Sequence, residues 1–423
     1  MPSFTQLLTT SSRLLAHLSG PAGAPAHVRK RGAAPVIALI GLLGLASCGG
    51  GDPESANEAT RKKPLAIAAP AASQWSALIP LSLVPAAAAN LANGKVVLWS
   101  AETRFSFSAG GQTYTTIFDP TTRTATETLV SNTGHNMFCP GTSNLPDGRL
   151  LVNGGIDSGK TSIYNPTTNS WSVAATMNIA RGYEANCVLE DGSVFTLGGS
   201  WSGGVGNKHG EVWTEAAGWK RLTGVPIDSM LSVDPSRNFG GDSHFWMFPA
   251  PNGKVFHAGP GVDMHWIGTQ GVGSVSTVGP RGDDQFSVNG NAVMYDIGKL
   301  LKTGGGPAYE GVNANANSYI IDINAGATVR KITPMAYARV FHNSVVLPNG
   351  QVVIVGGQTY ANAFTDNNAV LRPELFDPVT ETFTLLPPIA VGRNYHSVAL
   401  LMPDARALRG RGGRRGDDRP CGR

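Results

Sequence analysis

Four short strings combine residue types that could take part in chemistry at a site. They are His135-Asn136-Met137-Phe138-Cys139-Pro140, Ala180-Arg181-Gly182-Tyr183, Gly198-Gly199-Ser200-Trp201-Ser202-Gly203-Gly204 and Asn394-Tyr395-His396-Ser397. Thiol, phenol and imidazole groups can all ligate a transition metal. Each also has a plainer interpretation, because a lone cysteine is usually a small buried hydrophobe, a buried tyrosine a core aromatic, and a histidine beside a strand a structural residue. Only the combination of the four strings indicates chemistry.

A repeat that could position these strings runs through the chain from residue 90 onward. Each copy has a turn ending in Gly, then a short β-branched or apolar strand, and usually a Gly pair, and such turns are strong hairpin signals. The turn glycines are Gly94, Gly148, Gly192, Gly253, Gly298 and Gly350. Their separations of 54, 44, 61, 45 and 52 residues are near the kelch period of about 50, with one four-stranded blade per repeat. The pattern predicts an all-β fold, a kelch-type β-propeller over residues 75–404.

The number of blades follows from a further turn at Pro403-Asp404. After it, arginines interrupt the strand pattern, so we expect a seven-bladed propeller whose seventh blade is incomplete. Residues 405–423 are an aberrant tail with seven arginines. Because glycine codons of a GC-rich gene become arginine and alanine codons when read out of frame, one hypothesis for the tail is a frameshift. A genuine basic tail is the alternative.

The composition excludes several classes of protein. With 53 Gly, 28 Pro and 41% hydrophobic residues among 423, the chain is neither disordered nor collagenous, and it favours a large core with many tight turns. The net charge of +4 arises at the two ends, since residues 48–404 carry 22 basic and 27 acidic side chains. The charge therefore gives no reason to expect a nucleic-acid partner.

The amino-terminal residues resemble an export signal. Arg29-Lys30-Arg31 precedes an apolar run from Ala33 to Ala46, which ends at Ser47-Cys48 and is too short to span a bilayer comfortably. We expect a lipoprotein-type signal segment with a long lead-in over 1–47, lipidation of Cys48, and a tether over 48–74. The protein would then be exported and anchored by lipid to the cell envelope, at the outer membrane, or secreted. A plain secretory signal with an incidental cysteine is the alternative.

In their order and spacing, the four strings resemble the galactose oxidase and glyoxal oxidase family of copper radical oxidases. The likeness extends from Gln74 to Asp404 and includes the strings Val84–Ala89 and Gly290–Asp296. It implies oxidation of primary alcohols, or of aldehyde hydrates, by O2 to aldehydes or acids and H2O2. The small-molecule substrate would be an alcohol or a carbohydrate.

The resemblance also implies roles for individual residues. Cys139 and Tyr183 would be joined by a thioether into a self-processed radical cofactor, with Tyr183 also a copper ligand. Trp201 would stack over the modified ring and shield it. Tyr395 would be the axial ligand and general base, and His396 an equatorial ligand.

Two departures from the family pattern concern the metal and the substrate. The family's second histidine ligand comes from a carboxy-terminal domain, and the resemblance implies that this chain is truncated before it, which would leave copper weakly bound or the chain inactive. The sugar-binding arginine falls near Gly240 and the glutamine at Glu310, which makes galactose a doubtful substrate. The expected substrate-binding residues are Phe138, Phe364, Tyr309 and Glu310. The resemblance gives no ligand role to four histidines, which we expect to be structural: His135, His244, His265 and His342.

The cysteines fit this interpretation and imply no disulfide framework. Cys48 would be lipidated, Cys139 cross-linked, Cys421 lies in the tail, and Cys187 is left alone. We expect a monomer. Two rival hypotheses stay open: a non-catalytic kelch propeller that binds glycans or proteins at the cell surface through its loops, and a fragment that does not fold.

Overall fold

The structure of the chain is a computed structural model that describes residues 74–107, 109–234 and 240–410. The described residues belong to one compact unit. The expected signal segment, Cys48, nearly all of the tether, and residues 411–423 of the expected tail lie outside the described residues.

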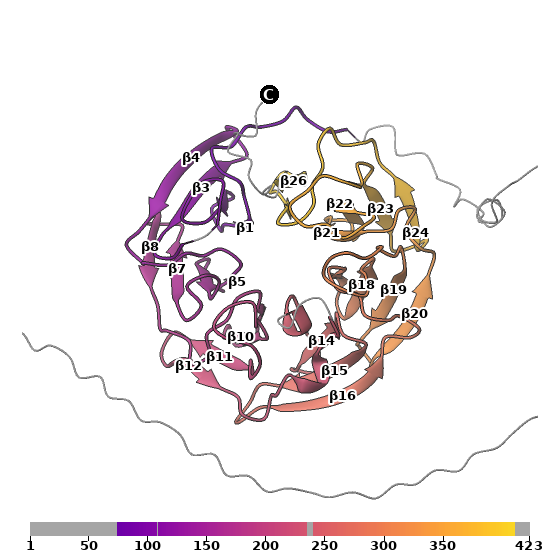
Figure 1. Ribbon diagram of the computed structural model, residues 1–423, viewed down its shortest axis with the longest axis horizontal. Helices are drawn as coiled ribbons and strands as arrows, with labels where there is room; N and C mark the ends of the chain where they lie inside the picture. Colours follow the sequence, from indigo (N-terminus) through magenta and orange to yellow (C-terminus); the bar gives the residue numbers. More distant parts are fainter. Residues whose placement is uncertain (1–73, 108, 235–239, 411–423) are drawn as a thin grey trace, which may run out of the picture. The chain divides into compact units, whose positions relative to one another are not determined.

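Six antiparallel sheets of four strands each follow one another around a ring, as Figure 1 shows. The first three are β1 (Ala87–Asn90), β2 (Val96–Trp99), β3 (Thr113–Asp119) and β4 (Thr124–Val130); β5 (Gly141–Asn144), β6 (Leu150–Asn153), β7 (Thr161–Asn165) and β8 (Ser170–Val173); and β9 (Ala185–Val188), β10 (Val194–Leu197), β11 (Glu211–Thr214) and β12 (Gly218–Arg221). The next three are β13 (Trp246–Pro249), β14 (Val255–Gly259), β15 (Asp263–Gly268) and β16 (Ser274–Pro280); β17 (Asn291–Asp296), β18 (Lys299–Thr303), β19 (Ser318–Asp322) and β20 (Thr328–Ile332); and β21 (Val340–Val346), β22 (Val352–Gln358), β23 (Glu374–Asp377) and β24 (Thr382–Leu385). Two short 3-10 helices, η1 (Asp228–Met230) and η2 (Gly240–Asp242), precede β13.

Each sheet is a meander in which strands consecutive in the sequence are hydrogen-bonded neighbours. The first strand lies near the ring axis and the fourth at the rim (Figure 1). The second strands β2, β6, β10 and β22 are buried along their whole length. Their apolar side chains pack between neighbouring sheets and form the core.

The expected all-β propeller is confirmed, but the structure has six blades, whereas we expected seven with the last one incomplete. The last repeat contributes a two-stranded sheet, β25 (Val398–Leu401) with β26 (Ala407–Gly410), and β25 contacts β1 and β21. β26 lies within the segment that we assigned to the tail. Among residues 411–423 the sequence has no aliphatic or aromatic side chain except Pro420, so these residues lack the apolar pattern of a third strand.

The turn glycines have the conformation that the repeat requires. All six have φ between +68° and +86°, a region that suits glycine in a tight hairpin. In the last sheet Ala405 takes this position with φ +63°. No helix within the described ranges is both long and apolar enough to cross a membrane.

Candidate functional site

One backbone position recurs at the inner end of the sheets and supplies the candidate site. Six residues there have φ between +57° and +66°: Cys139, Tyr183, His244, Asn289, Phe341 and His396. Each precedes the turn residue of its repeat by nine residues. A bulky side chain rarely adopts this left-handed conformation, and such strain is concentrated at functional sites. Because the position lies within two residues of the start of the innermost strand, the ring brings these side chains together.

The three expected metal ligands converge in this cluster. The Tyr183 and Tyr395 hydroxyls are hydrogen-bonded to each other, and Tyr183 Oη lies 3.1 Å from His396 Nε2. Tyr183 and Tyr395 are 5% and 8% exposed. Two phenol oxygens and one imidazole nitrogen form a mixed oxygen and nitrogen donor set, which fits Cu(II).

His396 is oriented by a second contact. Its imidazole hydrogen-bonds the backbone of Ala86, while Nε2 faces Tyr183. Burial, together with the nearby His244, lowers the pKa of His396 to about 3. The ring is therefore neutral at physiological pH, and a backbone bond on one nitrogen leaves the other available to a metal.

Tyr183, unlike His396, must lose a proton before its phenol oxygen becomes a strong metal ligand. Burial, with Cys139 next to it, holds the pKa of Tyr183 well above its usual value. The phenol oxygen therefore keeps its proton unless a cation is bound beside it. Within the described ranges no three or more His, Cys, Asp and Glu side chains gather to hold a metal ion. The candidate metal site consequently depends on its tyrosines.

Cys139 lies beside Tyr183. The Tyr183 amide donates a hydrogen bond to the Cys139 carbonyl oxygen at 2.9 Å, and the thiol contacts the Tyr183 side chain. Cys139 is in no disulfide, and its Sγ lies 3.8 Å from His396 Nε2. Burial raises the pKa of this thiol well above its usual value, so thiolate formation would also need a nearby cation.

The Tyr183 ring is flanked by two other rings. Trp201 stacks on it with ring centroids 4.8 Å apart and an angle of 30°, and His244 lies 4.5 Å away. The Trp201 loop is fixed by Ser200, whose hydroxyl donates to Asp242 at 2.6 Å, and by Ser202, whose hydroxyl donates to the Gly155 carbonyl at 2.6 Å. Tyr183 is thereby covered by a loop with little freedom.

The four residues that we expected to contact substrate take two different places. Phe138 and Phe364 are aromatic neighbours of the candidate ligands, with Phe138 4.7 Å from His396 and Phe364 4.8 Å from Tyr395 between ring centroids. Tyr309 is fully buried instead, and its hydroxyl lies 2.9 Å from Tyr395 Oη. The side chain of Glu310 accepts a hydrogen bond from the Ala363 amide at 3.1 Å, beside Phe364.

Sequence reasoning missed His244 and Phe341. His244, which we expected to be structural, lies 3.2 Å from Tyr309 Oη through its Nε2, and Phe341 packs against Tyr395 with centroids 5.0 Å apart. The spacing of nine residues before each turn could have identified both. His135 Nδ1 lies 2.9 Å from the Ser162 hydroxyl of β7, and His342 Nε2 lies 2.9 Å from the Thr303 hydroxyl of β18.

Comparisons with known proteins indicate the family. A family profile described as "Glyoxal oxidase N-terminus" matches residues 307–415. A solved structure of a fungal alcohol oxidase of the AA5 family, in complex with copper, is 38% identical, with a TM-score of 0.77 over 80% of this chain and 72% of that chain. The chain belongs to the galactose oxidase and glyoxal oxidase family of copper radical oxidases.

Curated relatives give the same family. A galactose oxidase of Gibberella zeae is 40% identical over 362 residues, which is 82% of this chain and 53% of the relative. An aldehyde oxidase of Arabidopsis thaliana, GLOX1, is 33% identical over 95 residues, or 21% of this chain and 15% of the relative. The chain thus spans about half the length of the galactose oxidase that it matches.

Proposed function

We propose that this protein is a copper radical oxidase that converts primary alcohols, or aldehyde hydrates, and O2 into aldehydes, or acids, and H2O2. The convergence of Tyr183, Tyr395 and His396 carries the proposal, because donors from two repeats, 212 and 213 positions apart in the sequence, meet within hydrogen-bonding distance. These three residues would hold copper. When bound, copper would supply one of the two redox equivalents that alcohol oxidation needs. A fourth ligand would come from outside the described residues or from solvent.

Cys139 and Tyr183 would supply the second equivalent. A thioether between Sγ and the Tyr183 ring forms with loss of the thiol hydrogen and one ring hydrogen, and O2 is the oxidant that accepts them. An ortho sulfur makes a phenol easier to oxidise, and the stacked Trp201 ring would shield it from water. The contact between the two side chains supports this assignment.

Tyr395 would act as the general base. Its oxygen lies beside Tyr183 Oη, where an alcohol hydroxyl would have to enter, and Tyr309 holds it at 2.9 Å. Phe138 and Phe364 form apolar walls near His396 and Tyr395, which suits a small primary alcohol or one face of a sugar. Glu310 would contribute a polar edge beside Phe364.

The test begins with copper-free protein. Copper(II) and air are added, and peptides that contain Cys139 and Tyr183 are analysed by mass spectrometry for a joined pair lighter by about two hydrogens, alongside an H2O2 assay with primary alcohols. The Cys139→Ser variant, which should fold and form no cross-link, is the control. Folded protein with neither cross-link nor peroxide would contradict the proposal and favour a non-catalytic propeller.

We also propose that the protein is exported, with residues 1–47 removed as a signal segment and Cys48 lipidated at the start of the 48–74 tether. The basic and apolar sequence before Cys48 supports this. Intact mass and detergent partitioning of the mature protein test it, and a Cys48→Ser variant distinguishes a lipid anchor from simple secretion. A protein that keeps residues 1–47 would contradict the proposal.

A further inference from the structure

Two buried histidines face each other across adjacent strands of the blade formed by β13 to β16. His257 of β14 and His265 of β15 are register partners, and both side chains are fully buried. Their Nδ1 atoms lie 3.3 Å apart, and their ring centroids lie 5.3 Å apart. We expected His265 to be structural, and neither ring belongs to the candidate site around Tyr183. The pair therefore needs an explanation of its own.

Hydrogen bonds satisfy this pair only in part. The 3.3 Å between the Nδ1 atoms is longer than the usual hydrogen bond from an N–H group, which is about 2.7–3.2 Å. Backbone groups of Gly259 and Asp263 interact with the rings of His257 and His265, respectively. The Nε2 atom of each ring is buried and has no hydrogen-bond partner in the described structure. Since buried polar atoms normally have partners, two facing rings of this kind are an exception.

The two Nδ1 atoms have the spacing of ligands on one metal ion. A bond from a metal to an imidazole nitrogen is about 2.0–2.1 Å long, so two such nitrogens at tetrahedral or trigonal angles lie about 3.3–3.6 Å apart. An ion in line with both lone pairs would also place the ring centroids about 5.2–5.5 Å apart. The observed separations of 3.3 Å and 5.3 Å agree with both values.

A methionine continues the row on the next strand. Met247 of β13 is the register partner of His257, and paired residues project from the same face of a sheet, with Cβ atoms about 4.5–5.5 Å apart. This face packs against the preceding blade, because Met247, Val255 and Ile267 share a core cluster with residues of β9 and β10. Phe245 of the same cluster lies edge-on to His257, with ring centroids 4.9 Å apart. One thioether and two imidazoles therefore share one face.

The surroundings of the pair favour a soft monovalent ion. Burial, followed by His265 and Arg281, holds the pKa of His257 well below its usual value, and burial also lowers the pKa of His265. Both rings are therefore neutral and can donate lone pairs. The two charges that act on them, Arg281 and Asp263, have opposite signs, and neutral donors in a buried site offset the charge of a divalent ion poorly.

The donor types narrow the choice further. Within the described ranges no third His, Cys, Asp or Glu side chain joins the pair, so the additional donor from this chain would be the Met247 thioether. Thioether and imidazole groups together suit Cu(I).

We propose that His257, His265 and Met247 form a binding site for Cu(I) between two neighbouring blades. The Nδ1 atoms of both rings and the Met247 thioether would hold the ion. Each ring would bind as the neutral tautomer with its proton on Nε2, so binding releases no proton and transfers no electron. The site is distinct from the candidate site around Tyr183 and does not depend on the proposed oxidase function.

The test uses the full chain with 13C-labelled methionine methyl groups, in chloride-free buffer. Ag(I) replaces Cu(I), because it has the same charge and similar softness and is not oxidised by air. The Met247→Leu variant identifies the Met247 methyl resonance in the NMR spectrum of the wild type. We expect this resonance to shift saturably as Ag(I) is added.

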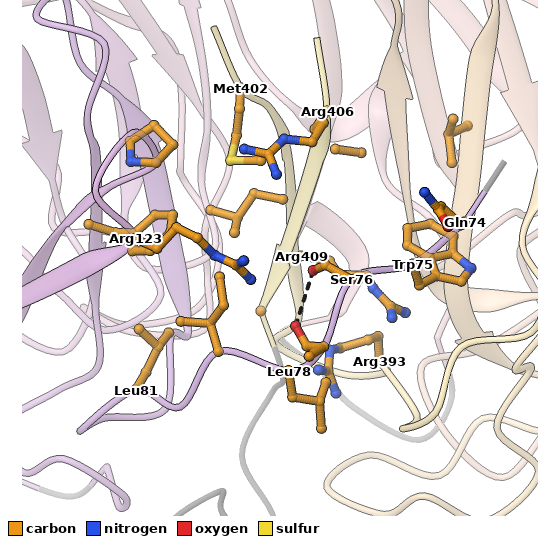
Figure 2. A pocket seen from close by; sticks show the side chains of 18 of the residues that line it. Gln74, Trp75, Ser76, Leu78, Leu81, Arg123, Arg393, Met402, Arg406 and Arg409 are labelled. Atoms are coloured by element: carbon orange, nitrogen blue, oxygen red, sulfur yellow. Dashed lines mark hydrogen bonds between the residues drawn. The ribbon is translucent and has the colours of Figure 1, made fainter. Parts of the chain in front are cut away.

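Two other methionines are internal controls for this measurement. Met264 precedes His265 but packs in a different core cluster from Met247. Met402 lines a cavity along β26 together with four arginines and no acidic residue or histidine among the described residues (Figure 2), and such surroundings disfavour a cation. The resonances of Met264 and Met402 should therefore not follow the Met247 shift.

Histidine variants then locate the ligands. His257→Gln and His265→Gln should each weaken Ag(I) binding, followed through the Met247 resonance, by at least about tenfold, since even the loss of an outer-shell partner costs about 10–100-fold in metal affinity. His342→Gln removes another buried histidine and is the matched control, with an expected change of less than about twofold. Competition of the same proteins with a colorimetric Cu(I) chelator under nitrogen should give the same ranking. Circular dichroism and thermal unfolding check that each variant folds.

Three results would overturn the proposal. The first is a Met247 resonance that does not shift, or that shifts no more than those of Met264 and Met402. The second is unchanged Ag(I) affinity in His257→Gln and His265→Gln, or an equal loss in His342→Gln. The third is a response to Zn(II) as strong as the response to Ag(I), which would contradict the preference for a soft monovalent ion. None of these measurements involves an alcohol or H2O2, so failure here and failure of the oxidase proposal are distinguishable.

Discussion

Acidification should destabilise the copper-free propeller through its buried histidines, and His342 gives the sharpest measurement. Its Nε2 lies 2.9 Å from the Thr303 hydroxyl. Burial, and then the nearby positive charges of Arg339 and Lys302, lowers the pKa of His342 to about 3. An unfolded histidine has a pKa of about 6.5. Since the unfolded chain takes up this proton first, the stabilising contribution is complete above pH 6.5 and is lost as the pH falls toward 3.

The size of the effect follows from the two pKa values. At pH 5, with a folded pKa near 3 and an unfolded pKa near 6.5, the loss is about 2 kcal/mol relative to pH 7.5. Other groups titrate in the same window, and burial raises the pKa of Glu184 to about 7, which acts in the opposite direction. Comparison of the wild-type protein with His342→Gln cancels the pH-dependent contributions of the other titrating groups, because both proteins contain them.

The assay is urea unfolding followed by tryptophan fluorescence at pH 7.5 and pH 5, in chelator. His342→Gln should lose about 2 kcal/mol less than the wild type between the two pH values. An equal loss in both proteins would refute the reasoning, because it would mean that His342 is not kept neutral by its surroundings.

Two further predictions concern pairs of buried groups. Glu374→Gln should lower the free energy of unfolding by about 3 kcal/mol or more, because Arg339 keeps its charge in a buried site. Urea unfolding measures this loss, and a loss below about 1 kcal/mol would contradict the prediction. Tyr309→Phe should cost about 1–3 kcal/mol, because both Tyr395 and His244 lose a hydrogen-bond partner. In copper-loaded protein it should also lower kcat more than it changes KM, and steady-state kinetics with unchanged kcat would count against the role of Tyr395 as base.

The repeat and the ligand strings were predictable because they depend on local sequence. The turn glycines with an apolar strand after them predict the strands, and the strings around Cys139, Tyr183 and His396 predict residues that the ring does bring together. Tyr309 could not be placed in the same way. Its contact with Tyr395 joins residues 86 positions apart, and no local pattern separates a buried hydrogen-bond partner from a substrate contact.

The number of blades was wrong for a related reason. The repeat pattern detects the first two strands of each sheet, because the turn between them is regular. The third strand follows a connection of variable length. β6 and β7 are separated by seven residues but β22 and β23 by fifteen. The inner hairpin alone therefore does not show that a blade is complete, and the last repeat forms only β25 and β26 among the described residues.

The left-handed position explains how one repeated backbone can build an irregular chemical site. It holds a thiol, a phenol, two imidazoles, an amide and a phenyl group in six repeats, while φ changes by less than 10°. Asn289 has the side chain that tolerates this conformation best, and its amide group donates to the Tyr309 carbonyl oxygen at 2.9 Å. Asn289→Gly should lose only that hydrogen bond, while Asn289→Val should lose the bond and add backbone strain of about 1–2 kcal/mol. Urea unfolding of the two variants measures the difference, and equal stabilities would show that the position can relax and does not fix the site.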